Sequence, residues 1–268
     1  MIVSVSRRCD IPAFAGGWFM EQWRRGEVTV RNPFRPARAR TVSLKKEDVD
    51  AFVFWSRDPR PFLPHLAAID RAGIPYYFLI TATGYPAQLE PGVPSSDAAA
   101  GFFRELAARV ARRRVIWRYD PVLFTGQTPF DFHVENFSRL AGRLAPFTSR
   151  VIVSFFDLYP KVRRRLQKAG VSVETAAGSP EQQLDLLGRF AAVAAGTGLE
   201  IQSCAEPAIA AGVSLGKCID EGLLNELFNL NLAYRKDPAQ RKLCLCQQSV
   251  DIGSYGTCGH GCPYCYAR

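Results

Sequence analysis

The sequence predicts an α/β protein built on a TIM-like (β/α) barrel, closed or partial, with a Cys-rich C-terminal extension folded over the rim at the carboxyl ends of the strands. Up to about residue 205, short β-branched or aromatic runs alternate with helical patterns, which is typical of a mostly parallel sheet with outer helices. The 268 residues are 47% hydrophobic, which is enough for one full core. The eight cysteines lie almost entirely in the final quarter of the chain.

Six apolar runs are the expected strands. Strands buried on both faces read as near-continuous apolar segments rather than as alternating ones, and each of these runs has that character. The runs occupy residues 2–6, 51–55, 75–80, 114–119, 150–156 and 199–203.

Two segments between these strands carry clear helix signals. Ser179 has the side chain of an N-cap, Pro180 suits the first helical position, and Gly198 ends the apolar pattern. A second helix is expected to begin at Ser96 or Asp97 and to continue to about residue 110. These helices would cover the sheet.

Residues 27–44 interrupt the alternation with two short runs around a Pro- and Arg-rich connection, which predicts a hairpin insertion. No linker or repeat divides the chain, so we expect residues 1–205 to form the barrel core. Residues 206–268 would form a helical and Cys-rich iron-sulfur extension packed on the same domain. No apolar run is long enough for a membrane span, and the first residues are no secretory signal, which favours a cytoplasmic protein without a membrane partner.

Polar residues follow each expected strand. Ligands of parallel α/β proteins bind at the carboxyl ends of the strands, so these residues are expected to line a polar pocket. The alternative is that the arginines and carboxylates pair with one another and only cap the sheet. The candidate catalytic residues are Arg7, Arg8, Asp10, Arg57, Arg118, Asp120, Asp157 and Glu206.

The net charge of +9 leaves nucleic acid open as a partner. The arginines of the expected hairpin are the group best placed to follow a phosphate backbone. No stacking module or groove-reading motif accompanies them. Nucleic-acid binding is therefore the alternative rather than the leading interpretation.

Three cysteines in the last eleven residues, Cys258, Cys262 and Cys265, have the spacing C-x3-C-x2-C, with Tyr264 before the last. This pattern resembles the cluster-binding loop of the radical S-adenosylmethionine (SAM) superfamily. The resemblance implies that the three thiolates hold three irons of a [4Fe-4S] cluster and that the fourth iron chelates SAM. It also implies that the backbone near Tyr264 lies against the adenine.

The chain also resembles, over nearly its whole length, a bacterial family of unknown function whose cysteine cluster is itself noted as similar to the radical SAM one. The shared motifs are "SRRCDIPAF", "WSRDP", "ATGYPAQLEPGVP", "WRYDP" and "CLCQQSVDIGSYGTCGHGCPYCYA". Radical SAM enzymes carry the cysteine motif after the first strand, whereas here it lies near residue 260. We therefore expect the tail to fold back over the strand rim, beside the loop from Arg7 to Asp10.

Four more cysteines precede that loop, and four thiolates complete a metal site. They would bind an auxiliary [4Fe-4S] cluster or a structural zinc ion, and the C-x-C spacing of the last two favours iron and sulfur. The first of them is alternatively a small buried apolar residue. His260 is expected to hydrogen-bond cluster sulfur or solvent rather than to be a ligand. The four cysteines are Cys204, Cys218, Cys244 and Cys246.

The leading hypothesis is an enzyme that uses the [4Fe-4S] cluster to cleave SAM and to abstract hydrogen from an unknown substrate, with an electron donor such as a flavodoxin or ferredoxin. The strand-end arginines would hold anionic groups, and the carboxylates would contact hydroxyl or amino groups. The alternative is a nucleic-acid-binding protein stapled by iron-sulfur or zinc, without SAM chemistry. A zinc hydrolase is weaker, because catalytic zinc usually has histidine or carboxylate ligands.

Overall fold

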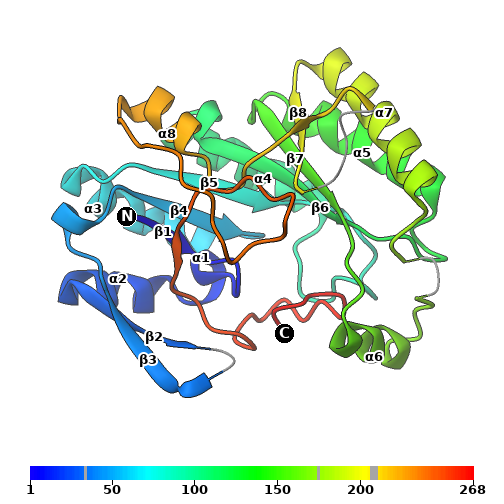
Figure 1. The fold of residues 1–268 in the computed structure, drawn as a ribbon. Coiled ribbons are helices and arrows are strands. Elements are labelled where there is room, and N and C mark those ends of the chain that lie inside the picture. The colour runs from blue at the N-terminus through cyan, green and yellow to red at the C-terminus, as the bar shows by residue number, and fades with distance from the viewer. Residues whose placement is uncertain (33–34, 174–175, 206–210) are drawn as a thin grey trace.

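The computed structural model describes residues 1–32, 35–173, 176–205 and 211–268 (Figure 1). Its centre is an eight-stranded parallel sheet with the order β10-β1-β4-β5-β6-β7-β8-β9. Six strands stand in sequence order and confirm the six expected runs. They are β1 (Ile2–Val5), β4 (Ala51–Ser56), β5 (Tyr76–Thr81), β6 (Val115–Val122), β7 (Arg150–Phe155) and β8 (Glu200–Ser203).

The sheet is open, so the closed form of the expected barrel is not observed. Two short strands from the C-terminal extension, β9 (Ser214–Leu215) and β10 (Val250–Asp251), occupy its two edges. β9 pairs with β8 and β10 pairs with β1. Closure would require β1 to meet the β8 side of the sheet, and the described part of the chain makes no such pairing.

Two of the longer helices begin at a serine that caps them. Ser95 accepts a hydrogen bond from the Ala98 N–H at the start of α4, and Ser179 forms a capping box with Gln182 at the start of α7. The α-helices are α1 (Ile11–Phe14), α2 (Gly16–Arg25), α3 (Leu66–Ala72), α4 (Ser96–Val110), α5 (Phe130–Leu144), α6 (Pro160–Lys168), α7 (Pro180–Thr197) and α8 (Glu221–Phe228). The 3-10 helices are η1 (Lys46–Asp48), η2 (Arg60–His65) and η3 (Arg112–Arg114).

The expected hairpin is present as β2 (Glu27–Asn32) and β3 (Arg35–Ser43), which pair antiparallel outside the main sheet. None of the helices in the described ranges combines the length and the apolar character that a membrane span requires.

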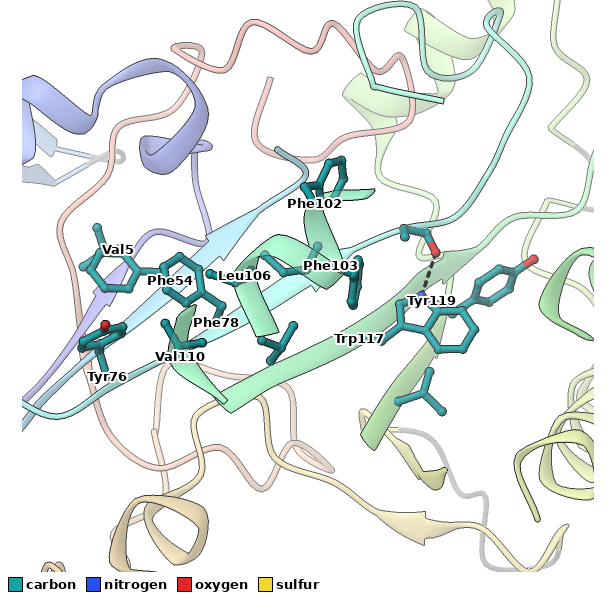
Figure 2. Close-up of a cluster of buried hydrophobic side chains, with 14 of the residues drawn as sticks. Val5, Phe54, Tyr76, Phe78, Phe102, Phe103, Leu106, Val110, Trp117 and Tyr119 are labelled. Atoms are coloured by element: carbon teal, nitrogen blue, oxygen red, sulfur yellow. Dashed lines mark hydrogen bonds between the residues drawn. The ribbon is translucent and has the colours of Figure 1, made fainter. Parts of the chain in front are cut away.

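Aromatic side chains of the central strands pack against α4 (Figure 2). Phe54 of β4 stacks on Phe78 of β5 with ring centroids 4.9 Å apart, and both are fully buried. Phe103 and Leu106 of α4 belong to the same buried cluster. Each such side chain contributes about 1.5–3 kcal/mol by leaving water, so this cluster holds the strand ends in fixed positions.

The C-terminal tail returns to the N-terminal strand and crosses the carboxyl ends of the strands. After β10, the tail passes between α1 and α6 (Figure 1). The ring of His260 lies 4.8 Å from the ring of Phe14 of α1. Arg165 of α6 donates to the carbonyl of Pro263 at 3.1 Å. The loop that carries Cys258, Cys262 and Cys265, called the cysteine loop below, therefore lies over the strand rim. It lies beside the Arg7 to Asp10 loop, as the sequence predicts.

Candidate functional site

Asp10 ties the loop after β1 to the cysteine loop. One oxygen of its carboxylate accepts from the Ser56 hydroxyl at 2.7 Å, and the other accepts from the Arg57 N–H at 2.7 Å. His260 Nε2 lies 2.8 Å from that second oxygen, and its Nδ1 lies 2.9 Å from the carbonyl oxygen of Gly92. His260 is buried and bonded to protein oxygens, so the expectation that it bonds sulfur or solvent is wrong.

A second contact between the tail and the strand ends is built on Arg57. Its guanidinium donates to Glu90 at 2.7 Å, to the Tyr264 hydroxyl at 2.7 Å and to Thr83 at 3.2 Å. Tyr264 and Thr83 also donate to Glu90. Burial lowers the pKa of Arg57, but the Glu90 carboxylate and the nearby thiols raise it well above its ordinary value. Arg57 is therefore a fixed cation beside the cysteine loop.

The three thiols of the cysteine loop lie among buried and charged groups. Burial raises the pKa of Cys262 to about 12, while the neighbouring Arg57 cation acts in the opposite direction. Burial also raises the pKa of Cys258, as does the charge of Asp10, while backbone hydrogen bonds with His260 and Asp10 act in the opposite direction. The Ala267 N–H lies 3.4 Å from the sulfur of Cys265. Backbone N–H groups directed at sulfur are a usual feature of iron-sulfur ligands.

Arg7, which follows β1, and Arg118, inside β6, flank the indole of Trp55. Their guanidinium carbons lie 5.8 and 4.7 Å from the centre of the indole ring. The Nε atoms of both arginines and the indole N–H are buried and have no hydrogen-bond partner among the described residues. Unpaired buried donors are costly, so the indole N–H and the Nε groups of the two flanking arginines indicate a place where an acceptor group can bind.

Most of the candidate catalytic residues already have ion-pair or hydrogen-bond partners within the protein. Arg7 also donates to Ser249 at 2.6 Å, and Arg118 forms an ion pair with Asp120. Arg8 lies 3.8 Å from Asp251, and the exposed Asp157 lies 2.9 Å from Arg241. Glu206 lies outside the described residues. Ion pairing therefore accounts for much of the polar rim, as the structural alternative predicts, with the donors around Trp55 as the exception.

The four upstream cysteines come together in a separate apolar cluster. The sulfurs of Cys204 and Cys218 are 3.9 Å apart, and all four side chains are buried. Hydrogen bonds from the Cys218 and Cys244 thiols lower the pKa of Cys204, and they lower the pKa of Cys246 to about 2. The pKa values of the two donor thiols, Cys218 and Cys244, are raised by the same contacts.

Neither thiol group is a ready-made coordination cage. In the described ranges, no three His, Cys, Asp or Glu side chains are arranged to hold a metal ion. Two surface hollows, of about 530 and 420 Å³, lie beside α4 and are lined by residues such as Phe102 and Arg143. Neither hollow is lined by Arg7, Asp10, Arg57 or Arg118, so the polar groups rather than these hollows define the candidate site.

Sequence reasoning missed two carboxylates of this site. Glu90 follows the strand β5 by nine residues in a Pro-rich loop, where no periodicity marks it. Asp251 accepts from Ser4 at 2.9 Å, from Ser6 at 2.7 Å and from the Arg7 N–H at 2.7 Å, and so holds the tail against β1. Both lie inside motifs quoted above, but only the fold reveals their partners.

Comparison with protein families gives one result that covers the chain. Residues 2–267 match the model of DUF1848, described as a domain of unknown function. The chain therefore belongs to this family, in agreement with the resemblance noted from its motifs. A search of curated proteins finds no match.

Proposed function

We propose that this DUF1848 protein is a radical SAM-type enzyme that binds one [4Fe-4S] cluster at Cys258, Cys262 and Cys265. The observation that carries the proposal is the position of the cysteine loop. It lies over the carboxyl ends of the strands, held there by the contacts of His260 with Asp10 and of Tyr264 with Arg57 and Glu90. This rim is where parallel α/β folds bind their ligands.

The sheet supports the same interpretation. We interpret β1 and β4 to β8 as a partial (β/α) barrel, because they are parallel neighbours in sequence order. The tail then supplies from the C-terminal side the loop that radical SAM enzymes supply after the first strand. Its contacts with Asp10, which follows β1, are consistent with that substitution.

The donor set fits the proposed cofactor. Three thiolates bind three irons, and the fourth iron is left for SAM. Cys258 and Cys265 are only partly buried, so a ligand can approach them. When bound, a cluster of this type supplies the electron that cleaves SAM to methionine and a 5'-deoxyadenosyl radical, which abstracts hydrogen from the substrate.

We assign separate roles to the cation beside the cysteine loop and to the unpaired donors. Arg57 provides positive charge beside Cys262 and Cys265, and this charge favours the thiolate form of Cys262. The unpaired donors of Arg7, Arg118 and Trp55 bind the carboxylate of SAM or an anionic group of the substrate.

Asp10 has a different role from the substrate contact expected of it. Its oxygens are occupied by Ser56, the Arg57 N–H and His260, so we assign it to positioning the tail. Asp120 stays a candidate for contact with a substrate amino or hydroxyl group, although in the structure it forms an ion pair with Arg118.

The test is SAM cleavage by full-length protein, purified and reconstituted without oxygen and reduced with dithionite. Methionine and 5'-deoxyadenosine are measured by chromatography, with iron and sulfide counted in the same samples. We expect both products from the wild type and background levels from Cys262→Ala, with an unchanged circular dichroism spectrum. Cleavage by the variant, or none by a wild type that holds four irons with matching sulfide, would contradict the proposal.

A further inference from the structure

The four upstream cysteines converge from three separate segments. Cys204 follows β8, Cys218 precedes α8, and Cys244 and Cys246 lie in the loop that leads to β10. All four are free thiols, and each is at most 9% exposed. They belong to one apolar cluster with residues of β4, β5 and α8. Four thiols in one apolar cluster, from segments so far apart in sequence, are more than packing requires.

The contacts between the sulfurs form a closed ring. Cys204 contacts Cys218 and Cys244, and Cys246 contacts the same two thiols. The sulfurs of Cys204 and Cys218 lie 3.9 Å apart. A tetrahedral zinc site with Zn–S bonds of 2.3 Å has sulfurs about 3.8 Å apart. A [4Fe-4S] cluster binds each thiolate to a different iron, so its four sulfurs must be considerably more widely separated.

Charge around the ring favours a thiolate site. Zinc with four thiolates carries two negative charges, which are costly in an apolar cluster unless cations or N–H groups lie nearby. The Arg241 guanidinium donates to the Cys204 carbonyl at 3.2 Å and lies 4.0 Å from its sulfur. A backbone hydrogen bond from Ile219 reaches Cys246, and Arg118 is close enough to Cys204 and Cys218 to affect them electrostatically.

We propose that Cys204, Cys218, Cys244 and Cys246 bind a single zinc ion as a closed structural site, independent of the cluster proposed for the tail. The ring as it stands is held by thiol hydrogen bonds and is not yet a coordination cage. Zinc binding releases the thiol protons and draws the four sulfurs onto one centre, with no change in oxidation state. This assignment replaces the iron-sulfur interpretation that the C-x-C spacing favours.

The zinc site fastens the segment that carries the tail. Asp237 accepts from Arg7 at 3.4 Å, and its N–H donates to the Cys246 carbonyl at 3.0 Å. Gln247, next to Cys246, donates through its N–H to the Ile219 carbonyl at 2.9 Å. Fixing Cys244 and Cys246 against β8 therefore also fixes the start of β10 and the approach of the tail to β1.

The experiment counts metals in full-length protein that lacks the tail thiols. Cys258, Cys262 and Cys265 are all replaced by Ala, and the protein is purified without oxygen from medium containing zinc and iron. We expect one zinc per chain and no acid-labile sulfide. Adding Cys218→Ser to this background should remove the zinc, whereas adding Cys9→Ser, the matched control at the remaining thiol, should leave it.

A second measurement needs no further substitution in the ring. Zinc released from the tail-thiol variant by a mercurial thiol reagent is followed with a chromogenic chelator, and cobalt is then added to the demetallated, re-reduced chain. We expect full release of one zinc and the absorption bands of tetrahedral cobalt with four thiolates. Bound iron with sulfide, a chain that binds neither zinc nor cobalt, or zinc kept after Cys218→Ser would overturn the assignment.

Discussion

The two groups of thiols in this molecule differ in number, surroundings and contacts. The upstream four are buried in an apolar cluster and contact one another. The tail three lie in one short loop among charged groups, and two of them are partly exposed. Four donors in contact can saturate one ion, whereas three donors at a rim of ligand-binding type leave a coordination position for a small molecule. The arrangement of the thiols is therefore the basis on which we propose a structural role for the first group and a catalytic role for the second.

Removing the charge of Glu90 should cause the largest loss of free energy of unfolding. Its direct effect should be confined to the surroundings of the tail cysteines. Glu90→Gln leaves the buried Arg57 guanidinium without its carboxylate partner, which typically costs about 3–5 kcal/mol. Urea unfolding of the full chain measures this loss. The zinc content should not change, because the upstream ring lies elsewhere. Glu21→Gln, which breaks an exposed ion pair with Arg25, is the control and should have little effect. A loss as small as the control's would mean that another group balances Arg57.

Lowering the pH provides a second comparison, because protons bind to His133 in the core as well as to the thiolates of the proposed zinc site. Burial lowers the pKa of His133 to about 4, and its neutral ring bonds the Tyr119 hydroxyl and the Leu123 carbonyl. Between pH 6.5 and 4 the unfolded chain binds a proton that the folded chain does not. Stability therefore falls as the pH falls through this window, by about 3 kcal/mol below pH 4.

The His133→Gln variant tests that assignment, because glutamine does not titrate. Urea unfolding at pH 4, 5, 6 and 7 should show a smaller decline for this variant than for the wild type. Zinc release from this variant as the pH falls then reports protonation of the upstream thiolates, without the contribution of His133. Equal declines in the two proteins would show that His133 does not set the acid response.

The smallest expected effect comes from crowding the tail loop. A Cβ at position 92 would lie 2.8 Å from the backbone oxygen of His260, which cannot rotate away. Gly92→Ala should therefore cost about 1–3 kcal/mol and lower the iron content, with zinc unchanged. Gly101→Ala on α4 is the matched control, since its Cβ meets nothing within 4 Å, and it should stabilise the helix by about 0.5–1 kcal/mol. An iron content equal to that of the control would show that the tail loop can shift to make room for the added Cβ without losing iron.

The main strands and the two best-marked helices could be predicted because burial and capping leave local signals. The six apolar runs became β1 and β4 to β8, and Ser179 caps α7 as its type and position indicate. The edge strands β9 and β10 could not be predicted, because each has two residues and no pattern of its own. Their pairing depends on the path of the chain, and it leaves the sheet open.

The candidate site could be predicted only in part, for a similar reason. Cysteine type and clustering indicated the thiol groups, and strand ends indicated Arg7, Asp10, Arg57 and Arg118. Glu90 and Asp251 were missed because their partners are distant in sequence. The convergence of four sulfurs into one ring is likewise a property of the tertiary fold, so spacing alone does not reveal it.

The pairing of β10 with β1 also determines when the site is assembled. Ser4 donates a hydrogen bond to Asp251, and Asp10 contacts His260. These partners lie 247 and 250 residues away along the chain. Synthesis proceeds from the N-terminus, so the sheet can begin to fold while its β1 edge is still unpaired. The cysteine loop reaches the strand rim last, onto a frame that is already made. In the function proposed above, the cluster would therefore be bound by a loop whose contacts with the strand rim depend on a sheet that has already formed.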